Sequence, residues 1–290
     1  MSAFFFFVQL LNAVQYGLIL YLVASGLTLL FGIMGVINLA HGAFYMVGAY
    51  LAFAVVQHLA SFWLALPLAI VLGLLLGAVL ERFLLARLEG ADHLSQVLLS
   101  FGLILLINEA QRIIFGNDAH GIEVPAPLNF SIPLSETFAY PAYRLFICAI
   151  GIVFVIALGL VMGRTRIGMM LRASAENRTM ARALGVDAKL IYLGVTAAGI
   201  ACAVLAGVIA APIASVYPGM GDQVLILSFV VIVLGGIGSL TGALVGALLL
   251  GAVDAFGKQF FPDFAAFLVY VAMIAVLIVR PQGLFRGIGA

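Results

Sequence analysis

The sequence predicts an all-α polytopic membrane protein, a bundle of about seven to nine transmembrane helices. Between Met1 and Leu80 there is no Lys, Arg, Asp or Glu. Of the 290 residues, 65% are hydrophobic and 9% are charged. A soluble fold needs charged side chains on its surface, whereas a charge at the middle of a spanning helix costs about 2.5–3.5 kcal/mol. The composition therefore excludes a soluble globular protein.

We expect residues 1–290 to form a single transmembrane domain. A span needs about 20 apolar residues to cross a hydrocarbon core of roughly 30 Å. No polar segment reaches about 50 residues, the lower end of ordinary domain sizes, so no soluble domain is predicted. If a nucleotide drives this protein, another polypeptide must hydrolyse it.

Apolar runs mark the expected helices in order. They cover residues 4–30, 43–57, 62–80, 97–115, 143–162, 190–211, 224–255 and 264–279. The seventh run is too long for one simple span, and the glycine-rich stretch GGIGS at 235–239 interrupts it. We expect this stretch to end one helix and begin another.

Basic residues predict the direction of the chain through the membrane. Residues 164–189 hold six of the thirteen Lys and Arg residues and should face the cytoplasm. Residues 116–142 carry three acidic residues, four prolines and no Lys or Arg, which indicates an external loop. The N-terminus is then periplasmic and the tail with Arg280 and Arg286 is cytoplasmic. Ends on opposite sides require an odd number of crossings, so the seventh run should be a broken pair.

A glycine-flanked polar break, GVINLAHG, follows the first span at residues 35–42. It contains Asn38, His41 and Gly42. One interpretation is a cytoplasmic turn with a helix cap. The other is a broken helix that lines a translocation path, because non-helical backbone at membrane depth is tolerated where it lines a cavity or is buried in protein.

A second break, GGIGSLTG, occupies residues 235–242 and includes Gly235, Gly236 and Gly238. It is the second candidate for the translocation path. Gly238, Gly242 and Gly246 are spaced by four, so they share one helix ridge and allow close backbone approach. Packing inside the subunit is favoured over a dimer interface.

Few polar residues occur within the spans. Gln9, Asn12 and Gln15 recur every three residues and share a helix face. They could contact a polar substrate, but hydrogen bonds between helices are favoured. Two charge pairs at helical spacing, Glu109 with Arg112 and Asp254 with Lys258, are predicted to be structural. A proton relay through Asp254 lacks a continuing chain of acids.

The segment RASAENRTMARALG at residues 172–185 is too polar to span. Its strong helix formers and terminal glycine predict a short surface helix. Alanine and leucine on one side and arginines on the other suit lipid headgroups and a partner protein equally.

No motif in the sequence indicates catalysis, a metal site or a bound cofactor. It contains no Walker A loop, nucleophile elbow or paired His/Cys metal spacing, and its four histidines are scattered. No basic patch interleaved with aromatics predicts nucleic-acid binding. The two cysteines lie in apolar runs and are expected to be buried without a redox role.

Four stretches together resemble one known family. They are GLTLLFGIMGVINLAHGAFYMVGAY at 26–50, GMMLRASAENRTMARALGVD at 168–187, VLGGIGSLTGALVGALLLG at 233–251 and VRPQGLF at 279–285. In order and separation they resemble the permease subunits of branched-chain amino acid ATP-binding-cassette importers, specifically the shorter LivH-like permease. The NLAHG and RPQGL stretches are the more specific.

The resemblance implies an importer in the bacterial inner membrane. It would contain a second, LivM-like permease, two cytoplasmic ATPases that use ATP, and a periplasmic substrate-binding protein. Matched by position, the family's ATPase-docking loop corresponds to Arg172, Ala173, Glu176, Asn177, Ala181 and Gly185. Its two breaks correspond to Asn38, His41 and Gly42, and to Gly235, Gly236 and Gly238. The loop departs from the broader importer pattern, which opens with Glu-Ala-Ala and ends with a Leu-Pro pair. Here Ala-Leu-Gly is present without the proline.

The expected function is therefore import of leucine, isoleucine and valine by alternating access. One alternative is a sister permease for another small neutral solute, such as urea or a short amide. Another is a carrier or channel that works alone, and a third, an intramembrane enzyme, lacks a catalytic constellation.

Overall fold

The computed structural model describes residues 3–88, 92–133 and 139–285. Its α-helices are α1 (Ala3–Leu29), α2 (His41–Leu59), α3 (Phe62–Phe83), α4 (His93–Phe115), α5 (Ala142–Arg164), α6 (Arg166–Glu176), α7 (Arg178–Ala183), α8 (Ala188–Ala210), α9 (Met220–Gly235), α10 (Leu240–Phe260) and α11 (Ala265–Val279). A π-helical turn, Leu30–Met34, extends α1, and 3-10 turns cover Leu85–Leu88, Ala126–Leu128, Ala211–Ile213 and Pro262–Phe264. Strands β1 (Ser131–Pro133) and β2 (Ala139–Pro141) pair antiparallel, with Ile132 opposite Tyr140.

The all-α membrane fold is confirmed. In the described residues, eight helices are long and apolar enough to cross a membrane. The shorter apolar helix α9 has 16 residues and is about 24 Å long, less than a hydrocarbon core of about 30 Å. Helices suit this chain because lipid offers no partners for backbone N–H and C=O groups.

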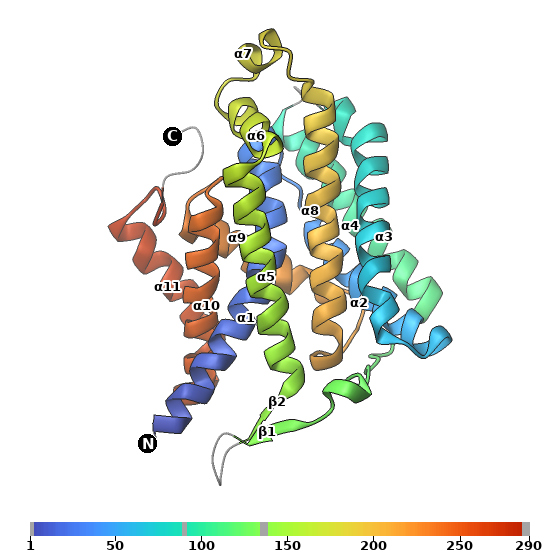
Figure 1. The fold of residues 1–290 in the computed structure, drawn as a ribbon, viewed down its shortest axis with the longest axis vertical. Coiled ribbons are helices and arrows are strands. Elements are labelled where there is room, and N and C mark those ends of the chain that lie inside the picture. The colour runs from blue at the N-terminus through green and yellow to red at the C-terminus, as the bar shows by residue number, and fades with distance from the viewer. Residues whose placement is uncertain (1–2, 89–91, 134–138, 286–290) are drawn as a thin grey trace.

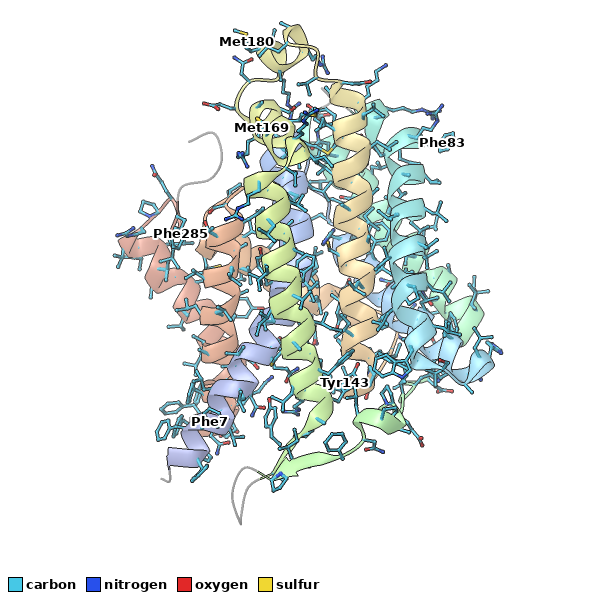
Figure 2. All side chains as sticks on the ribbon, viewed as in Figure 1. Phe7, Phe83, Tyr143, Met169, Met180 and Phe285 are labelled. Atoms are coloured by element: carbon cyan, nitrogen blue, oxygen red, sulfur yellow. The ribbon has the colours of Figure 1, made fainter. Side chains whose placement is uncertain are left out.

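The helices alternate in direction between two ends of the bundle (Figure 1). We call the end that carries α6 and α7 the α6–α7 end, and the other the N-terminal end, where α1 begins and β1 and β2 lie. Figure 2 places Met169, Met180 and Phe83 at the first and Phe7 and Tyr143 at the second. The described parts of residues 116–142 thus lie opposite residues 164–189, as the charge pattern predicts.

The C-terminal tail returns to the break after α9. Leu284 N donates to Leu234 O at 2.8 Å, and Phe285 N donates to Gly235 O at 3.0 Å. The start of α1 and the tail residues 280–285 therefore lie toward opposite ends of the bundle (Figure 1). This arrangement agrees with the expected odd number of passes, with α9 and α10 as a broken pair.

Helices α1 and α8 form the centre of the bundle. Within their most apolar windows, 89% of residues in the first span and 72% in α8 are buried, whereas the values for α4 and α11 are 11%. Peripheral helices such as α3, α4, α5 and α11 therefore present apolar side chains outward, to lipid or to another subunit. Cys148 and Cys202 are free thiols.

Small residues let the helix backbones touch. A side-chain carbon at Gly26 would meet the backbone of Gly199, and one at Gly77 would meet the backbone of Ala197. The predicted glycine ridge on α10 behaves in the same way, because Gly242 and Gly246 face the backbone of Gly235. Its packing is inside the subunit, as expected.

Both predicted breaks are present. After the π-helical turn, Gly35 adopts a φ of 68°, and the chain stays non-helical until α2 begins at His41. At the second break, α9 ends at Gly235 and α10 begins at Leu240. Gly236 has a φ of 102°, a conformation that residues with a Cβ rarely adopt, so the glycine is what allows the chain to turn here.

Helices α2 and α9 both begin inside the bundle, and their first turns touch. A side-chain carbon at Gly42 would overlap the carbonyl oxygen of Gly221. From this contact α2 runs toward the N-terminal end and α9 toward the α6–α7 end (Figure 1). The α1–α2 and α8–α9 segments therefore have opposite directions, each with a re-entrant connection before its second helix.

The surface helix expected over 172–185 is wrong in one respect, because the structure has two helices instead of one. The chain turns at Asn177, where φ is −150° and ψ is 98°. The side-chain Oδ1 of Asn177 accepts from Met180 N at 2.9 Å and caps α7. Asparagine favours this capping position over a helix interior, which explains the break. Gly185, with a φ of 88°, ends the segment as predicted.

Candidate functional site

Helix α7 is attached to the end of the first span by Arg178. Its guanidinium Nη2 donates to Ile33 O at 3.3 Å and to Met34 O. The same guanidinium lies over the ring of Tyr192 in α8, 5.2 Å from the ring centroid. One side chain thus joins the α6–α7 segment to the π-helical turn that precedes the first break.

The π-helical turn also contacts a buried polar group. Thr196 Oγ1 donates to Glu81 Oε2 at 2.7 Å and lies 3.5 Å from Met34 Sδ. Glu81 is 3% exposed and Thr196 is fully buried. Helices α3 and α8 are therefore coupled to the turn that Arg178 holds, and a displacement of that turn would disturb a satisfied buried network.

The six residues predicted to dock an ATPase lie along α6 and α7. Arg172, Ala173 and Glu176 are on α6, Asn177 lies between the helices, Ala181 is on α7 and Gly185 follows it. Ala173, Glu176, Asn177 and Gly185 are exposed, whereas Ala181 is buried. Two apolar side chains beside them are exposed, Met180 at 58% and Leu184 at 78%. Leucine on the apolar side of this segment was predicted from the sequence, whereas Met180 was not singled out.

Replacing Asn177 with alanine is expected to fray α7, because the Met180 amide loses its side-chain partner. Loss of an N-cap costs about 1 kcal/mol. Amide hydrogen exchange at residues 178–183 of the purified permease should accelerate about fivefold. Asn177→Asp keeps a capping oxygen and should exchange at the original rate; equal acceleration in both variants would contradict the capping role.

The residues of the first break are buried in the bundle. Asn38 is 2% exposed and its Oδ1 accepts from Ala40 N at 3.0 Å. His41 is fully buried, and its Nε2 lies 3.0 Å from Val23 O, so this nitrogen donates. Gly42 faces Gly221 of α9. The first break is therefore re-entrant backbone that is buried in the protein. A role of these residues in the translocation path remains a prediction.

Backbone atoms of other segments pack closely against the residues of the second break. Gly235 faces Gly242, Gly236 faces the carbonyl of Phe285, and Gly238 lies against Gly32 of the π-helical turn. The two breaks thus contact the same turn but lie at opposite ends of α9. For Gly235, Gly236 and Gly238 as well, a place on the path remains a prediction.

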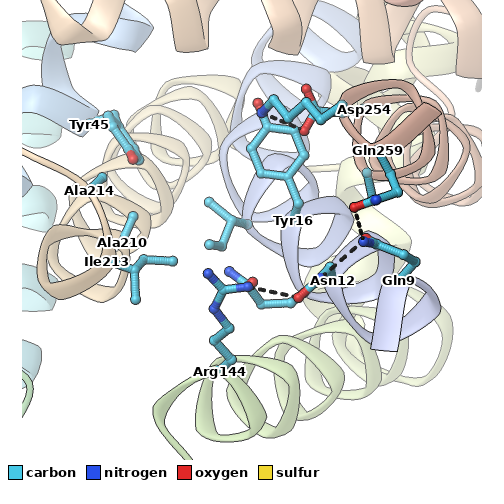
Figure 3. A pocket seen from close by; sticks show the side chains of 14 residues that line it. Gln9, Asn12, Tyr16, Tyr45, Arg144, Ala210, Ile213, Ala214, Asp254 and Gln259 are labelled. Carbon is cyan, nitrogen blue, oxygen red and sulfur yellow. Dashed lines mark hydrogen bonds and ion pairs between the residues drawn. The ribbon is translucent and has the colours of Figure 1, made fainter. Parts of the chain in front are cut away.

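A polar cavity of about 480 Å³ lies toward the N-terminal end of the bundle, and Figure 3 shows the side chains that line it. Its lining comes from α1, α2, α5, α10 and the end of α8. The residues are Gln9, Asn12, Gln15, Tyr16, Ile19, Tyr45, Arg144, Ala210, Ile213, Ala214, Asp254, Ala255, Lys258 and Gln259. We refer to this set as the polar cavity.

Hydrogen bonds between helices arrange the polar side of this cavity. Asn12 Oδ1 accepts from Arg144 Nη1 at 2.7 Å and from the Tyr140 hydroxyl at 3.2 Å. Gln9 Nε2 donates to Gln259 Oε1 at 3.0 Å. The prediction that Gln9 and Asn12 join helices is confirmed, and the same residues also line a cavity. Burial raises the pKa of Tyr140, in β2, to about 12, so its hydroxyl keeps the proton that it donates.

The predicted Asp254–Lys258 pair lies on the α10 side of the cavity. Lys258 Nζ donates to Asp254 Oδ2 at 2.8 Å and lies 5.5 Å from the centroid of the Tyr16 ring. Asp254, Lys258 and Tyr16 also line a second cavity, of about 340 Å³, between α1, α9, α10 and α11. These three residues therefore separate two cavities.

Sequence reasoning did not single out Arg144, Tyr16 or Tyr45. Arg144 offers a signal in retrospect, because it is a lone basic residue at the beginning of an apolar span that follows an acidic loop. Tyr16 and Tyr45 offer none, since tyrosines in apolar helices usually only pack. Their convergence with Asp254 depends on which helices are neighbours.

Comparisons with known proteins agree on one family. A family model described as "Branched-chain amino acid transport system / permease component" matches residues 9–277. The permease protein BraD of a high-affinity branched-chain amino acid transport system in Pseudomonas aeruginosa is 32% identical, with 95% of this chain and 94% of BraD covered. The corresponding LivH protein of Escherichia coli is 28% identical, with 97% and 95% covered.

A second kind of permease is also similar. The LivM protein of the Escherichia coli system is 29% identical, with 89% of this chain and 66% of LivM covered. No solved structure matches this chain. The similarity to both kinds spans most of this chain, so it concerns the whole helical bundle rather than one motif.

Proposed function

Because the chain belongs to the family of permease components of branched-chain amino acid transport systems, we propose that it is one of two membrane-spanning subunits of an ATP-driven importer of leucine, isoleucine and valine. The family match over residues 9–277 supports this function most directly. The protein is a multi-pass protein of the bacterial inner membrane. Its proposed partners are a LivM-like permease, two cytoplasmic ATPases and a periplasmic binding protein. The chain itself binds no cofactor, and ATP is used by the ATPases.

We propose that the α6–α7 end faces the cytoplasm. Among the described residues, its basic side chains are Arg82, Arg87, Arg164, Arg166, Arg172, Arg178, Arg182, Lys189 and Arg280. Those toward the other end are Arg112, Arg144 and Lys258. Such an excess favours a cytoplasmic location. The N-terminal end, with the polar cavity, then faces the periplasm.

In this orientation α6 and α7 project toward the ATPases. Met180 and Leu184 expose apolar surface next to arginines and Glu176, a combination that suits the apolar core and polar rim of a protein interface. The residues from Arg172 to Gly185 are the proposed docking segment. Lipid headgroups are the less favoured partner, because the exposed Met180 lies at the far tip of the bundle (Figure 2).

The proposed mechanism is alternating access driven through α7. Closure of the ATPases displaces α6 and α7, and Arg178 transmits the displacement to the π-helical turn at the end of α1. That turn contacts both breaks, and the first break leads to the α2–α9 contact at Gly42 and Gly221. Movement there can open the bundle toward the periplasm, where the binding protein releases its ligand. Selectivity depends mostly on the binding protein.

Reconstitution into proteoliposomes tests this function. Leucine should accumulate when the two permeases, the ATPases, ATP and a leucine-loaded binding protein are all present. Vesicles that contain this chain alone should accumulate none, and a non-hydrolysable ATP analogue is the matched control. Concentration of leucine by this chain alone would instead indicate a self-sufficient carrier, and uptake of only urea or a short amide would indicate a sister permease.

A further inference from the structure

We propose that the polar cavity binds the charged head group of the amino acid in transit, with Arg144 on its carboxylate and Asp254 on its ammonium group. This inference rests on the proposed function and assigns residues to it. The cavity presents both signs of charge, as a zwitterion requires. Urea or a short amide would gain little from two opposite charges.

Helix α1 lies between the two charged side chains (Figure 3). Arg144 reaches the cavity from α5 and is held by Asn12, whereas Asp254 lies on α10 beside Lys258, which covers Tyr16. Asn12 and Tyr16 are four residues apart on α1, so they lie on one face about 5–6 Å from each other. Figure 3 shows Arg144 and Asp254 on opposite sides of Tyr16. A head group lying along α1 can therefore contact both charges.

Each charged side chain has hydrogen-bonding capacity for a ligand. A guanidinium has five N–H donors, and Asn12 accepts from one nitrogen of Arg144. A carboxylate offers about four acceptor sites, and Lys258 donates to one oxygen of Asp254. The Lys258 side chain is 65% exposed, so it can move aside when an ammonium group binds. Planar pairing of guanidinium with carboxylate adds specificity.

An apolar wall lines another part of the cavity. Ile19, Ala210, Ile213 and Ala214 contribute it from α1 and the end of α8. The volume of about 480 Å³ lies within the range of small-molecule sites. A branched aliphatic side chain can pack on this wall while its head group contacts Arg144 and Asp254. The cavity lies toward the end that we place in the periplasm, where the binding protein releases its ligand.

The test compares leucine transported per ATP hydrolysed in the complete reconstituted importer. Arg144→Gln and Asp254→Asn should each lower this ratio about tenfold or more, the loss expected for one charge-assisted hydrogen bond. ATP hydrolysis stimulated by the binding protein should stay unchanged. Arg112→Gln is the matched control, because Arg112 pairs with Glu109 on α4 at the surface and should transport normally.

A purely structural role for Arg144 predicts a different pattern. If Arg144 only holds Asn12, then Asn12→Ala should lower the ratio as much as Arg144→Gln. We expect Asn12→Ala to have the smaller effect and Arg144→Lys to retain part of the transport. Equal loss in Asn12→Ala and Arg144→Gln, or normal transport by Arg144→Gln and Asp254→Asn, would overturn the proposal. These outcomes overturn only the assignment of the cavity, because the wild-type importer still transports leucine. A wild-type importer that transports no leucine would instead contradict the proposed function.

Thiol protection provides an independent readout of binding. Ala214→Cys, in a background with Cys148→Ala and Cys202→Ala, places a reactive thiol in the cavity wall. L-Leucine should slow its alkylation in the permease complex. Leucinamide, which lacks the carboxylate, and isocaproate, which lacks the amine, should protect much less. Equal protection by all three compounds, or none by leucine, would overturn the assignment.

Discussion

Replacing Gly207 with alanine is expected to destabilise the permease strongly. A Cβ at this position of α8 would overlap the carbonyl oxygen of Tyr45 and press on Ala49 N in α2. The obstacle is backbone on both sides, so no side chain can rotate away, and the helices must separate. Overpacking costs about 1–3 kcal/mol and occasionally more; here we expect about 3 kcal/mol or more. The yield of monodisperse protein and its thermal midpoint in detergent should both fall.

Gly194→Ala is the matched control, because Gly194 lies on the same helix and nothing lies within 4 Å of the position of its Cβ. This variant should be as stable as the wild type or slightly more stable, since alanine favours a helix by about 0.5–1 kcal/mol over glycine. If Gly207→Ala and Gly194→Ala have the same thermal midpoint, the close contact between α2 and α8 is not present in the protein.

Replacing Arg178 with glutamine is expected to uncouple ATP hydrolysis from transport. The variant loses the hydrogen bonds to Ile33 O and Met34 O and the contact with the Tyr192 ring. Hydrogen bonds from a charged group are worth about 1.5–3 kcal/mol each, so the attachment of α7 to the first span should be largely lost. In the reconstituted importer, leucine uptake should fall about tenfold while more than about half of the ATP hydrolysis remains.

Arg166→Gln tests whether charge alone matters, because Arg166 is an exposed arginine on the neighbouring helix α6 and lies outside the docking segment. It should leave the ratio of leucine to ATP unchanged. Arg178→Lys keeps the charge but loses the planar fork that reaches two carbonyls, and should give an intermediate ratio. If Arg178→Gln transports with the wild-type ratio, α7 does not act on the break through this side chain.

The two predicted breaks show what a local sequence pattern can and cannot predict. Runs of apolar residues and two glycine-rich interruptions predicted every long helix and both breaks, because helix formation in lipid depends on local composition. The same pattern could not show that Gly42 touches Gly221 of α9. That contact joins segments far apart in the sequence, and the glycines at 219 and 221 do not indicate which helix they meet.

The candidate site was only partly predictable for the same reason. Asn12 was recognised as a polar residue in the first span, and Asp254 as one half of a charge pair near a span end. A hydrogen bond between helices was expected for Asn12 and an ion pair with Lys258 for Asp254. Arg144 and Tyr16 became candidates only once α5 and α10 were seen to flank α1. The single surface helix expected over 172–185 was wrong, because the capping preference of Asn177 prevailed over the helix formers around it.

By itself, the sequence determined the class of protein, the order of its helices, the positions of its breaks and its family, since each depends on residues that are near neighbours or match by position. Only the tertiary structure decided which helices touch, that Arg178 reaches the end of the first span, and that opposite charges line one cavity. Backbone-to-backbone packing at glycines sets these relations, and glycines leave no side-chain pattern from which a partner helix can be read.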